Sequence, residues 1–117
     1  MTMPLSLTMS ESGGYAVARV KGALDIANTV ELEQDLLAVV PNVAMALIVD
    51  LTDVTFLDSS GIRILFDLAV RLERRQQQLR LVVPTPSPIL RTLSIVQLPS
   101  VVPVLGTLQE AIARPGA

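Results

Sequence analysis

A continuous apolar run, Ala46–Leu51, constrains the fold of this chain more than any other feature of its sequence. The run has the length of a strand, and apolar side chains on successive positions are typical of a strand that is covered on both faces. Such strands occur in sheets that carry helices on their faces. We therefore expect an α/β domain with this strand near the centre of its sheet.

The rest of the chain alternates between strand patterns and helix patterns. Two alternating segments, 5–9 and 15–21, flank Gly13-Gly14 and predict a β-hairpin. Helices are predicted over about 29–39 with Asn28 as N-cap, over the apolar repeat of Ile62, Leu65, Phe66, Ala69 and Leu72, over about 88–95 with Ser87 as N-cap, and from Thr107 to near Arg114. Further strands are predicted over 79–83 and 101–105, with a linker over 52–57. The order β-β-α-β-α-β-α-β-α predicts a mixed β-sheet with helices packed on it.

The length of the chain and its hydropathy indicate one domain over residues 1–117, with a frayed tail at 115–117. Half of the residues are hydrophobic, which is ample for a core. No apolar run approaches the roughly 18 residues that a membrane span needs, and the first ten residues carry neither a basic region nor a cleavage pattern. We expect a cytoplasmic protein with no membrane partner.

The composition excludes several classes of function. The chain has neither Cys nor His, so it lacks thiol nucleophiles, the commonest general base and the usual zinc ligands. A net charge of -2 and an aromatic content of 3% provide neither a basic stripe nor stacking platforms for nucleic acid. We therefore expect a binding protein without catalytic residues, cofactor or metal, and without direct nucleic-acid contacts.

One segment, Asp58-Ser59-Ser60-Gly61, carries polar groups that core formation does not require. It lies where a loop meets a predicted helix, with Phe56 and Leu57 as apolar anchors before it. Unpaired N–H groups in the first turn of a helix stabilise an anion, so a phosphate on Ser60 is expected to be tolerated there. We interpret Gly61 as leaving room for an approaching partner. The alternative is that Asp58 or Ser59 is only an N-cap and that the glycine is incidental.

The sequence around this segment resembles a known family. Leu47–Leu51 followed by Val54–Ile62 is similar to the signature of STAS domains of the anti-sigma factor antagonist type. The resemblance extends upstream to Val20–Asp25 and downstream to Leu79–Val83 and Leu108–Ile112, which together cover essentially the whole chain. One departure is Gln97, where the family often has a glycine that ends a helix in a left-handed turn.

The resemblance implies a partner switch. In such a switch the unphosphorylated antagonist binds an anti-sigma factor that is also a serine kinase, which releases a sigma factor. The kinase, which binds the ATP, then phosphorylates the antagonist, and a PP2C-type phosphatase restores it. The family's acceptor falls on Ser60, with Ser59 as its neighbour. The expected partner-binding residues are Asp25, Asp58, Ser59, Ser60, Gly61 and Ile62, with Asp50 and Asp53 as weaker candidates. The alternative is a scaffold or ligand-sensing STAS module of a stressosome-like or transport-linked assembly.

Overall fold

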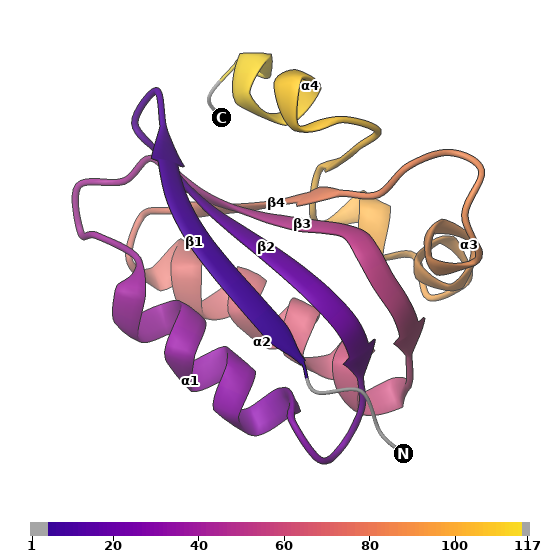
Figure 1. Ribbon diagram of the computed structural model, residues 1–117. Helices are drawn as coiled ribbons and strands as arrows, with labels where there is room; N and C mark the ends of the chain where they lie inside the picture. Colours follow the sequence, from indigo (N-terminus) through magenta and orange to yellow (C-terminus); the bar gives the residue numbers. More distant parts are fainter. Residues whose placement is uncertain (1–4, 116–117) are drawn as a thin grey trace.

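The computed structural model describes residues 5–115, which form one five-stranded sheet with helices on both of its faces (Figure 1). The order of the elements is as predicted, with one added 3₁₀ turn, η1. They are β1 (Ser6–Ser12), β2 (Tyr15–Leu24), α1 (Thr29–Val39), β3 (Ala46–Leu57), α2 (Ser59–Arg74), β4 (Gln78–Val82), α3 (Pro88–Ile95), η1 (Leu98–Ser100), β5 (Val104–Leu105) and α4 (Leu108–Ala113). Of the predicted frayed tail, Pro115 is exposed and residues 116 and 117 lie outside the described residues.

The sheet is mixed, as the sequence predicts. Its strands lie in the order β1-β2-β3-β4-β5; β1 is antiparallel to β2, and the other neighbours are parallel. The hairpin turn consists of Gly13 and Gly14, whose φ angles of 59° and 87° only glycine adopts at low cost. This two-residue turn pairs Ser12 with Tyr15 and so sets the register of the first two strands.

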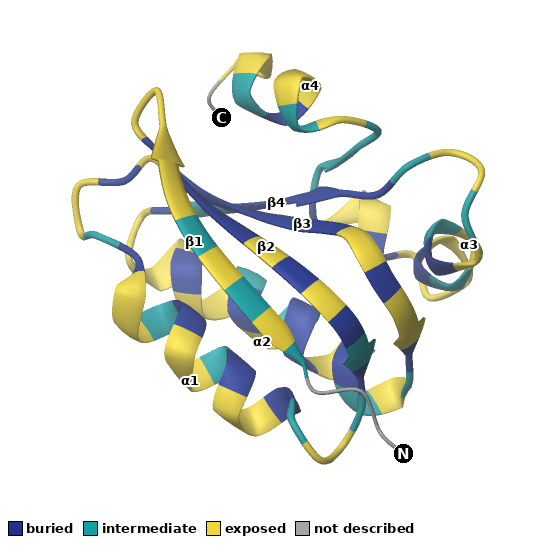
Figure 2. Cartoon of the chain, viewed as in Figure 1, coloured by how far each residue is buried: buried dark blue, intermediate teal, exposed yellow. Residues whose placement is uncertain are grey.

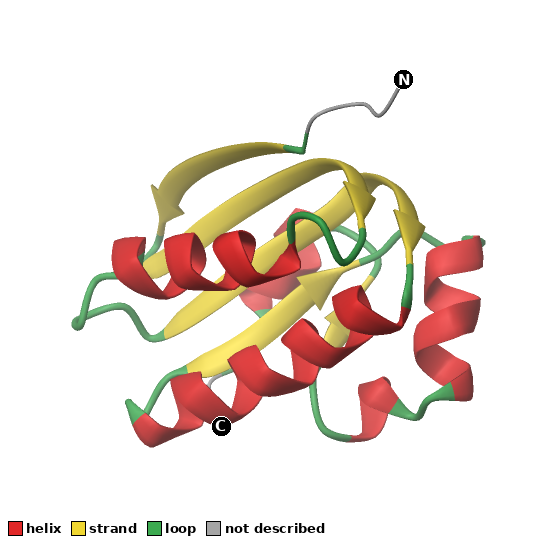
Figure 3. Ribbon diagram, turned by 90° about the horizontal axis from the view of Figure 1, so that it is seen from below, coloured by secondary structure: helices red, strands yellow, loops and turns green. Residues whose placement is uncertain are grey.

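The central strand β3 is buried on both faces along its first half, which confirms the prediction from the apolar run (Figure 2). Leu47 and Val49 belong to the large core under α1 and α2, whereas Ala46 and Ile48 belong to a smaller core under α4. The two faces are therefore covered by different helices, α1 and α2 on one and α4 on the other, with α3 beside the sheet (Figures 1 and 3). No helix within residues 5–115 is long and apolar enough to cross a membrane.

Two of the predicted boundaries are wrong. Residues 52–57 are not a linker but the second half of β3, where Leu57 pairs with Leu24 of β2. Two register shifts in this pairing disrupt the simple alternation of buried and exposed residues, which is why the segment does not resemble a strand in the sequence. At the other end of the chain, only Val104–Leu105 of the predicted strand 101–105 pairs with β4.

Helices α2 and α3 are each followed, two residues after their last residue, by a glutamine in the left-handed conformation: Gln76 and Gln97, both with φ 61°. The turn that glycine often provides is thus kept at Gln97 with a side chain that disfavours it. We expect Gln76→Gly and Gln97→Gly each to raise the free energy of unfolding by about 1 kcal/mol, because the strain outweighs the added freedom of the unfolded chain.

Urea denaturation of the purified variants measures this effect. The matched control is Gln34→Gly in the middle of α1, where glycine is expected to lower the free energy of unfolding by about 1 kcal/mol. Loss of stability in all three variants would contradict the assignment of strain to the two left-handed glutamines.

Candidate functional site

The candidate site forms where the carboxyl ends of β2 and β3 meet the start of α2. Leu24 and Leu57 are paired at the ends of these parallel strands, so the residues that follow them, Asp25 and Asp58, reach the same edge of the sheet. The Asp58 N–H donates to the Leu24 carbonyl at 3.1 Å, which ties the two strand ends together. The structure thus brings Asp25 to the Asp58–Ile62 segment, as the sequence predicts.

Asp58 is the N-cap of α2. Its Oδ1 accepts the backbone N–H groups of Ser60 at 2.9 Å and of Gly61 at 3.1 Å, and its carbonyl oxygen accepts the N–H of Ile62 at 3.0 Å. The prediction that the donors of this turn are unpaired is therefore wrong for these three residues. Three of the donors that an anion at this turn would use are therefore already taken by Asp58.

The Ser60 hydroxyl also donates to Asp58, at an Oγ–Oδ1 distance of 2.5 Å. Ser60 is half-buried, whereas Ser59 is exposed. The hydrogen bond from the Ser60 hydroxyl, with further bonds from the N–H groups of Gly61, Ser60 and Ile26, lowers the pKa of Asp58 against the opposing effect of burial. The carboxylate is therefore ionised at neutral pH and accepts the hydrogen bond from the Ser60 hydroxyl. The lone pairs of the Ser60 oxygen remain available to another group.

This lowered pKa predicts how stability depends on pH. A carboxylate with a lower pKa in the folded chain stabilises that chain above its unfolded value of 3.8, and the contribution is lost as the pH falls through the lower folded value. Asp58→Asn keeps a neutral capping group. We expect the wild type to exceed this variant in urea midpoint by a constant margin down to about pH 5, and by a shrinking margin below about pH 4. A margin that grows on acidification would contradict the role of the charge.

Gly61 is buried and faces the ends of the strands, so the interpretation that it leaves room for a partner is wrong. A Cβ at this position would lie 2.5 Å from Leu57 Cδ1, 3.1 Å from Leu24 Cβ and 3.2 Å from the Leu24 carbonyl oxygen. The glycine therefore allows α2 to start directly against the sheet. This close approach is what places Ser60 beside the end of β2.

We expect Gly61→Ala to lower the free energy of unfolding by about 1–3 kcal/mol, because the new methyl group overpacks the contact with Leu24 and Leu57. Gly106→Ala is the matched control, since its Cβ would approach only Glu110 Oε1, at 3.9 Å. Thermal denaturation of both variants measures the difference. Equal melting temperatures would show that the start of α2 can shift without cost.

Side chains around the site differ from the predictions in two respects. Asn28 precedes α1, but its side chain does not cap that helix; it accepts the Asp25 N–H at 3.2 Å and donates to the Ala23 carbonyl at 2.8 Å. These bonds, with the 2.9 Å bond from the Ala27 N–H to Asp25 Oδ1, fix the turn after β2. Asp50 is not at the site: it is buried in mid-strand, 3.6 Å from Arg19.

The sequence predicts only part of the exposed apolar surface near the site. Ile26 is 81% exposed and Phe56 is 53% exposed, and each lies within two residues of a strand end that forms the site. Phe56 was expected to be an anchor, but its ring is largely free. The sequence prediction did not include Ile26, although a large aliphatic residue inside the polar turn Asp25-Ile26-Ala27-Asn28 indicates an exposed apolar side chain.

Two further predicted residues lie at the border of the site. Ile62 is half-buried against the core. Asp53, opposite Lys21, stands further back along β3.

The fold and the site together define a small α/β module that presents a hydroxyl, carboxylates and exposed apolar side chains at one edge. No group of three or more His, Cys, Asp or Glu side chains among residues 5–115 is placed to hold a metal ion. The family model of the STAS domain matches residues 6–111. The chain therefore belongs to the STAS domain family.

Solved structures agree with this assignment. An anti-sigma factor antagonist from Mycobacterium paratuberculosis is 28% identical, with 96% of each chain covered and a TM-score of 0.82. The Bacillus cell fate determinant SpoIIAA in its phosphorylated form is 20% identical, with 92% of this chain and 96% of that chain covered and a TM-score of 0.63, and so shares the fold. A comparison with curated protein sequences found no match. The predicted fold and family are confirmed, and with them the expectation of a regulatory binding protein that is not an enzyme.

Proposed function

We propose that this chain is a cytoplasmic, partner-switching anti-sigma factor antagonist. In its unphosphorylated form it binds an anti-sigma factor that is also a serine kinase, and a sigma factor is released. The kinase uses its own ATP to phosphorylate Ser60, which ends the binding, and a PP2C-type phosphatase restores the free hydroxyl. The observation that carries the proposal is the Ser60 hydroxyl, held at the start of α2 by Asp58 in a STAS domain.

The chemistry of the surface around Ser60 supports this role. The bond to Asp58 orients the hydroxyl and leaves its lone pairs available to a phosphoryl donor. Ile26, whose N–H bonds to Asp58, provides exposed apolar area beside it, and such area is a source of binding energy when a partner covers it. Asp25, Ser59 and Ile62 complete the expected contact surface, whereas Gly61 contributes by its close packing. The solved Mycobacterium relative is described as an anti-sigma factor antagonist.

The test is phosphorylation by a cognate anti-sigma factor kinase with ATP, followed by mass spectrometry of the peptide that contains both serines. We expect one phosphate, on Ser60, and none after Ser60→Ala. Ser59→Ala is the matched control, because it removes the exposed neighbouring hydroxyl and leaves the bond to Asp58 intact. A phosphate found on Ser59 in the wild type, or elsewhere in the chain, would overturn the assignment.

The alternative function, a ligand-sensing STAS module of a larger assembly, is favoured by a different observation. The chain contains a cavity of about 730 Å³ beside the carboxyl-terminal half of α2. Co-purification from the native cell distinguishes the two functions, because an antagonist is recovered with an anti-sigma factor and a module of an assembly is recovered with several STAS chains.

A further inference from the structure

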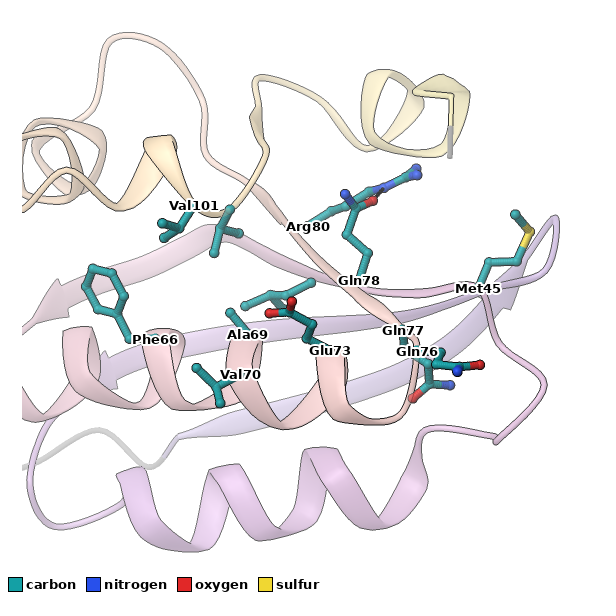
Figure 4. Close-up of a pocket in the computed structure, with 12 residues that line it drawn as sticks. Met45, Phe66, Ala69, Val70, Glu73, Gln76, Gln77, Gln78, Arg80 and Val101 are labelled. Carbon is teal, nitrogen blue, oxygen red and sulfur yellow. Dashed lines mark hydrogen bonds between the residues drawn. The ribbon is translucent and has the colours of Figure 1, made fainter. Parts of the chain in front are cut away.

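A cavity of about 730 Å³ lies between the last turns of α2, the start of β4 and the segment after η1 (Figure 4). Its volume is within the range of small-molecule sites in proteins. Its apolar wall comes from α2 and from the segment after η1, and consists of Phe66, Ala69, Val70, Val101 and Val102. Val70 is 48% exposed and Val101 is 62% exposed, so the folded chain leaves part of this wall uncovered.

The charged residues at the cavity do not favour a ligand of either sign. Glu73 and Arg80 both line it, one carboxylate and one guanidinium, and the other lining residues are uncharged. Neither of the two takes part in an ion pair within residues 5–115. A ligand is therefore selected by its shape and by the main-chain groups that it meets.

The cavity follows the edge of β4. Gln78, Leu79 and Arg80 all line it, although successive side chains of a strand point to opposite faces of the sheet. Leu79 belongs to the core under α1 and α2, whereas Arg80 lies over the ring of Tyr15 on the other face. A cavity that borders both residues runs along the edge of the strand, so the main chain of β4 forms one of its walls.

Two main-chain groups of β4 on this edge lack partners within residues 5–115. On the β5 side, the N–H of Leu81 donates to the Pro103 carbonyl at 2.9 Å. Alternate residues of a strand direct their N–H and C=O groups to the same side, so the Leu79 N–H and the Gln77 carbonyl point to this side as well. In a longer β5 both groups would pair with Val101, but neither forms a hydrogen bond in the described part of the chain.

The chain leaves the edge of β4 because η1 uses the groups that a longer strand would need. The N–H groups of Val101 and Val102 both donate to the Leu98 carbonyl, each at 3.0 Å. Pro103, the next residue, has no N–H to donate. The cavity thus occupies the position that a longer β5 would fill. Main-chain groups inside a protein are nearly always paired, so an unpaired donor and acceptor on one strand edge favour a ligand with a peptide group.

We propose that this cavity binds an extended peptide segment of another protein, which adds a short parallel strand to β4 in line with β5. One residue of the segment donates its N–H to the Gln77 carbonyl and accepts the Leu79 N–H with its own carbonyl, as in other cases of strand addition. The preceding residue points to the other face and places an apolar side chain on Phe66 and Ala69. The site is at the opposite end of α2 from Ser60, so the proposal does not depend on the proposed function.

The test is titration of ¹⁵N-labelled protein with the uncharged peptide acetyl-Thr-Val-Ala-amide. We expect saturable shifts of the Leu79 amide, which gains an acceptor, and of the Gln78 amide, whose peptide group contains the Gln77 carbonyl. The same peptide methylated at all three residue nitrogens is the matched control, because it keeps the side chains and carbonyls but has no N–H donor at these residues. It should bind about tenfold more weakly, since the Gln77 carbonyl then stays unpaired.

A filled cavity gives an independent measurement. Ala69→Leu places a larger side chain in the wall and is expected to abolish the peptide shifts while the amide spectrum stays dispersed. Ala38→Leu, at an exposed position of α1, is the matched control and should bind the peptide like the wild type.

Three results would overturn the proposal. They are the absence of saturable shifts at millimolar peptide, shifts confined to residues outside the cavity, and equal binding of the methylated and unmethylated peptides. The last result would assign the cavity to apolar contact alone, without strand addition. Because none of these measurements involves phosphorylation, failure here does not bear on Ser60.

Discussion

Phosphorylation of Ser60 is expected to weaken binding to the anti-sigma factor about a hundredfold. The hydroxyl now donates to Asp58, whose Oδ1 already accepts the N–H groups of Ser60 and Gly61. A phosphate removes that donor and adds roughly -1.5 to -2 charges beside an ionised carboxylate. It therefore turns away from Asp58, towards the surface that the partner covers.

The size of the effect follows from the Coulomb repulsion between the phosphate and Asp58, which grows when a partner displaces the water around them. Two like charges about 4 Å apart repel by about 4 kcal/mol at an effective dielectric of 20, and by about 1 kcal/mol when water separates them. The middle of that range corresponds to about a hundredfold in affinity. Steric obstruction beside Ile26 acts in the same direction. Because salt screens the charge but not the obstruction, part of the loss should disappear at high ionic strength.

Isothermal titration with the kinase partner measures this for the unphosphorylated protein, the phosphorylated protein and Ser60→Ala. We expect Ser60→Ala to bind like the unphosphorylated wild type, and Ser60→Asp to bind with intermediate affinity while melting within a few degrees of the wild type. Ser59→Asp is the matched control for charge at the adjacent exposed position and should have a smaller effect. Equal affinities for all forms, or amide shifts throughout the sheet on phosphorylation, would contradict a local mechanism.

Local sequence chemistry predicted most of the fold. The glycine pair at the hairpin, the apolar run of β3 and the capping residues Ser87 and Thr107 each act through neighbours close in sequence, and each forms the bonds expected of it. Ser87 Oγ accepts the Ile89 N–H at 3.1 Å, and Thr107 Oγ1 accepts the Glu110 N–H at the same distance. Such local signals predict the structure correctly because they do not depend on residues far away in the sequence.

Features that depend on distant partners were not predicted. Residues 52–57 are a strand because β2 pairs with them across two register shifts, and no local pattern encodes that pairing. Gly61 has its role because Leu24, more than thirty residues earlier, lies against it. The position of Ser60 at a helix start was predicted. The hydrogen bonds that Asp58 accepts from the Ser60 hydroxyl and from the N–H groups of Ser60 and Gly61 were not. Only the side-chain geometry distinguishes a free helix terminus from a capped one.

Arg80→Ala is expected to lower the free energy of unfolding by about 3–5 kcal/mol, the largest loss among the substitutions considered. Arg80 is 1% exposed in the middle of β4, a charged side chain within an apolar strand. Its Nη1 donates to the Ala111 carbonyl at 2.6 Å, and its Nη2 to the Pro115 carbonyl at 3.4 Å. The guanidinium also lies 4.7 Å from the centre of the Tyr15 ring. One side chain thus joins the sheet to α4 and to Pro115.

The physical reason is that the apolar contacts of α4 are few, since besides Ala111 only Leu108 and Ile112 of this helix pack against the small core, both partly buried. The helix is short, and of its residues only Ala111 is fully buried. Carbonyls at a helix end lack partners within the helix and carry partial negative charge, which a cation at that end stabilises. Removal of Arg80 leaves the Ala111 carbonyl without its donor and opens a cavity against Tyr15. We therefore expect α4 to separate from the sheet before the rest of the domain unfolds.

Hydrogen exchange and urea denaturation test this expectation together. In Arg80→Ala, amides of residues 108–113 should exchange much faster than in the wild type, whereas exchange of the β3 amides should be accelerated only by the loss of global stability. Arg80→Met keeps most of the volume but no donors and is expected to lose about 1–3 kcal/mol, which separates hydrogen bonding from packing. Arg91→Ala, an exposed arginine of α3, should behave as the wild type. If α4 remains protected in Arg80→Ala, apolar contacts of Leu108 and Ile112 hold the helix, and Arg80 is not its anchor.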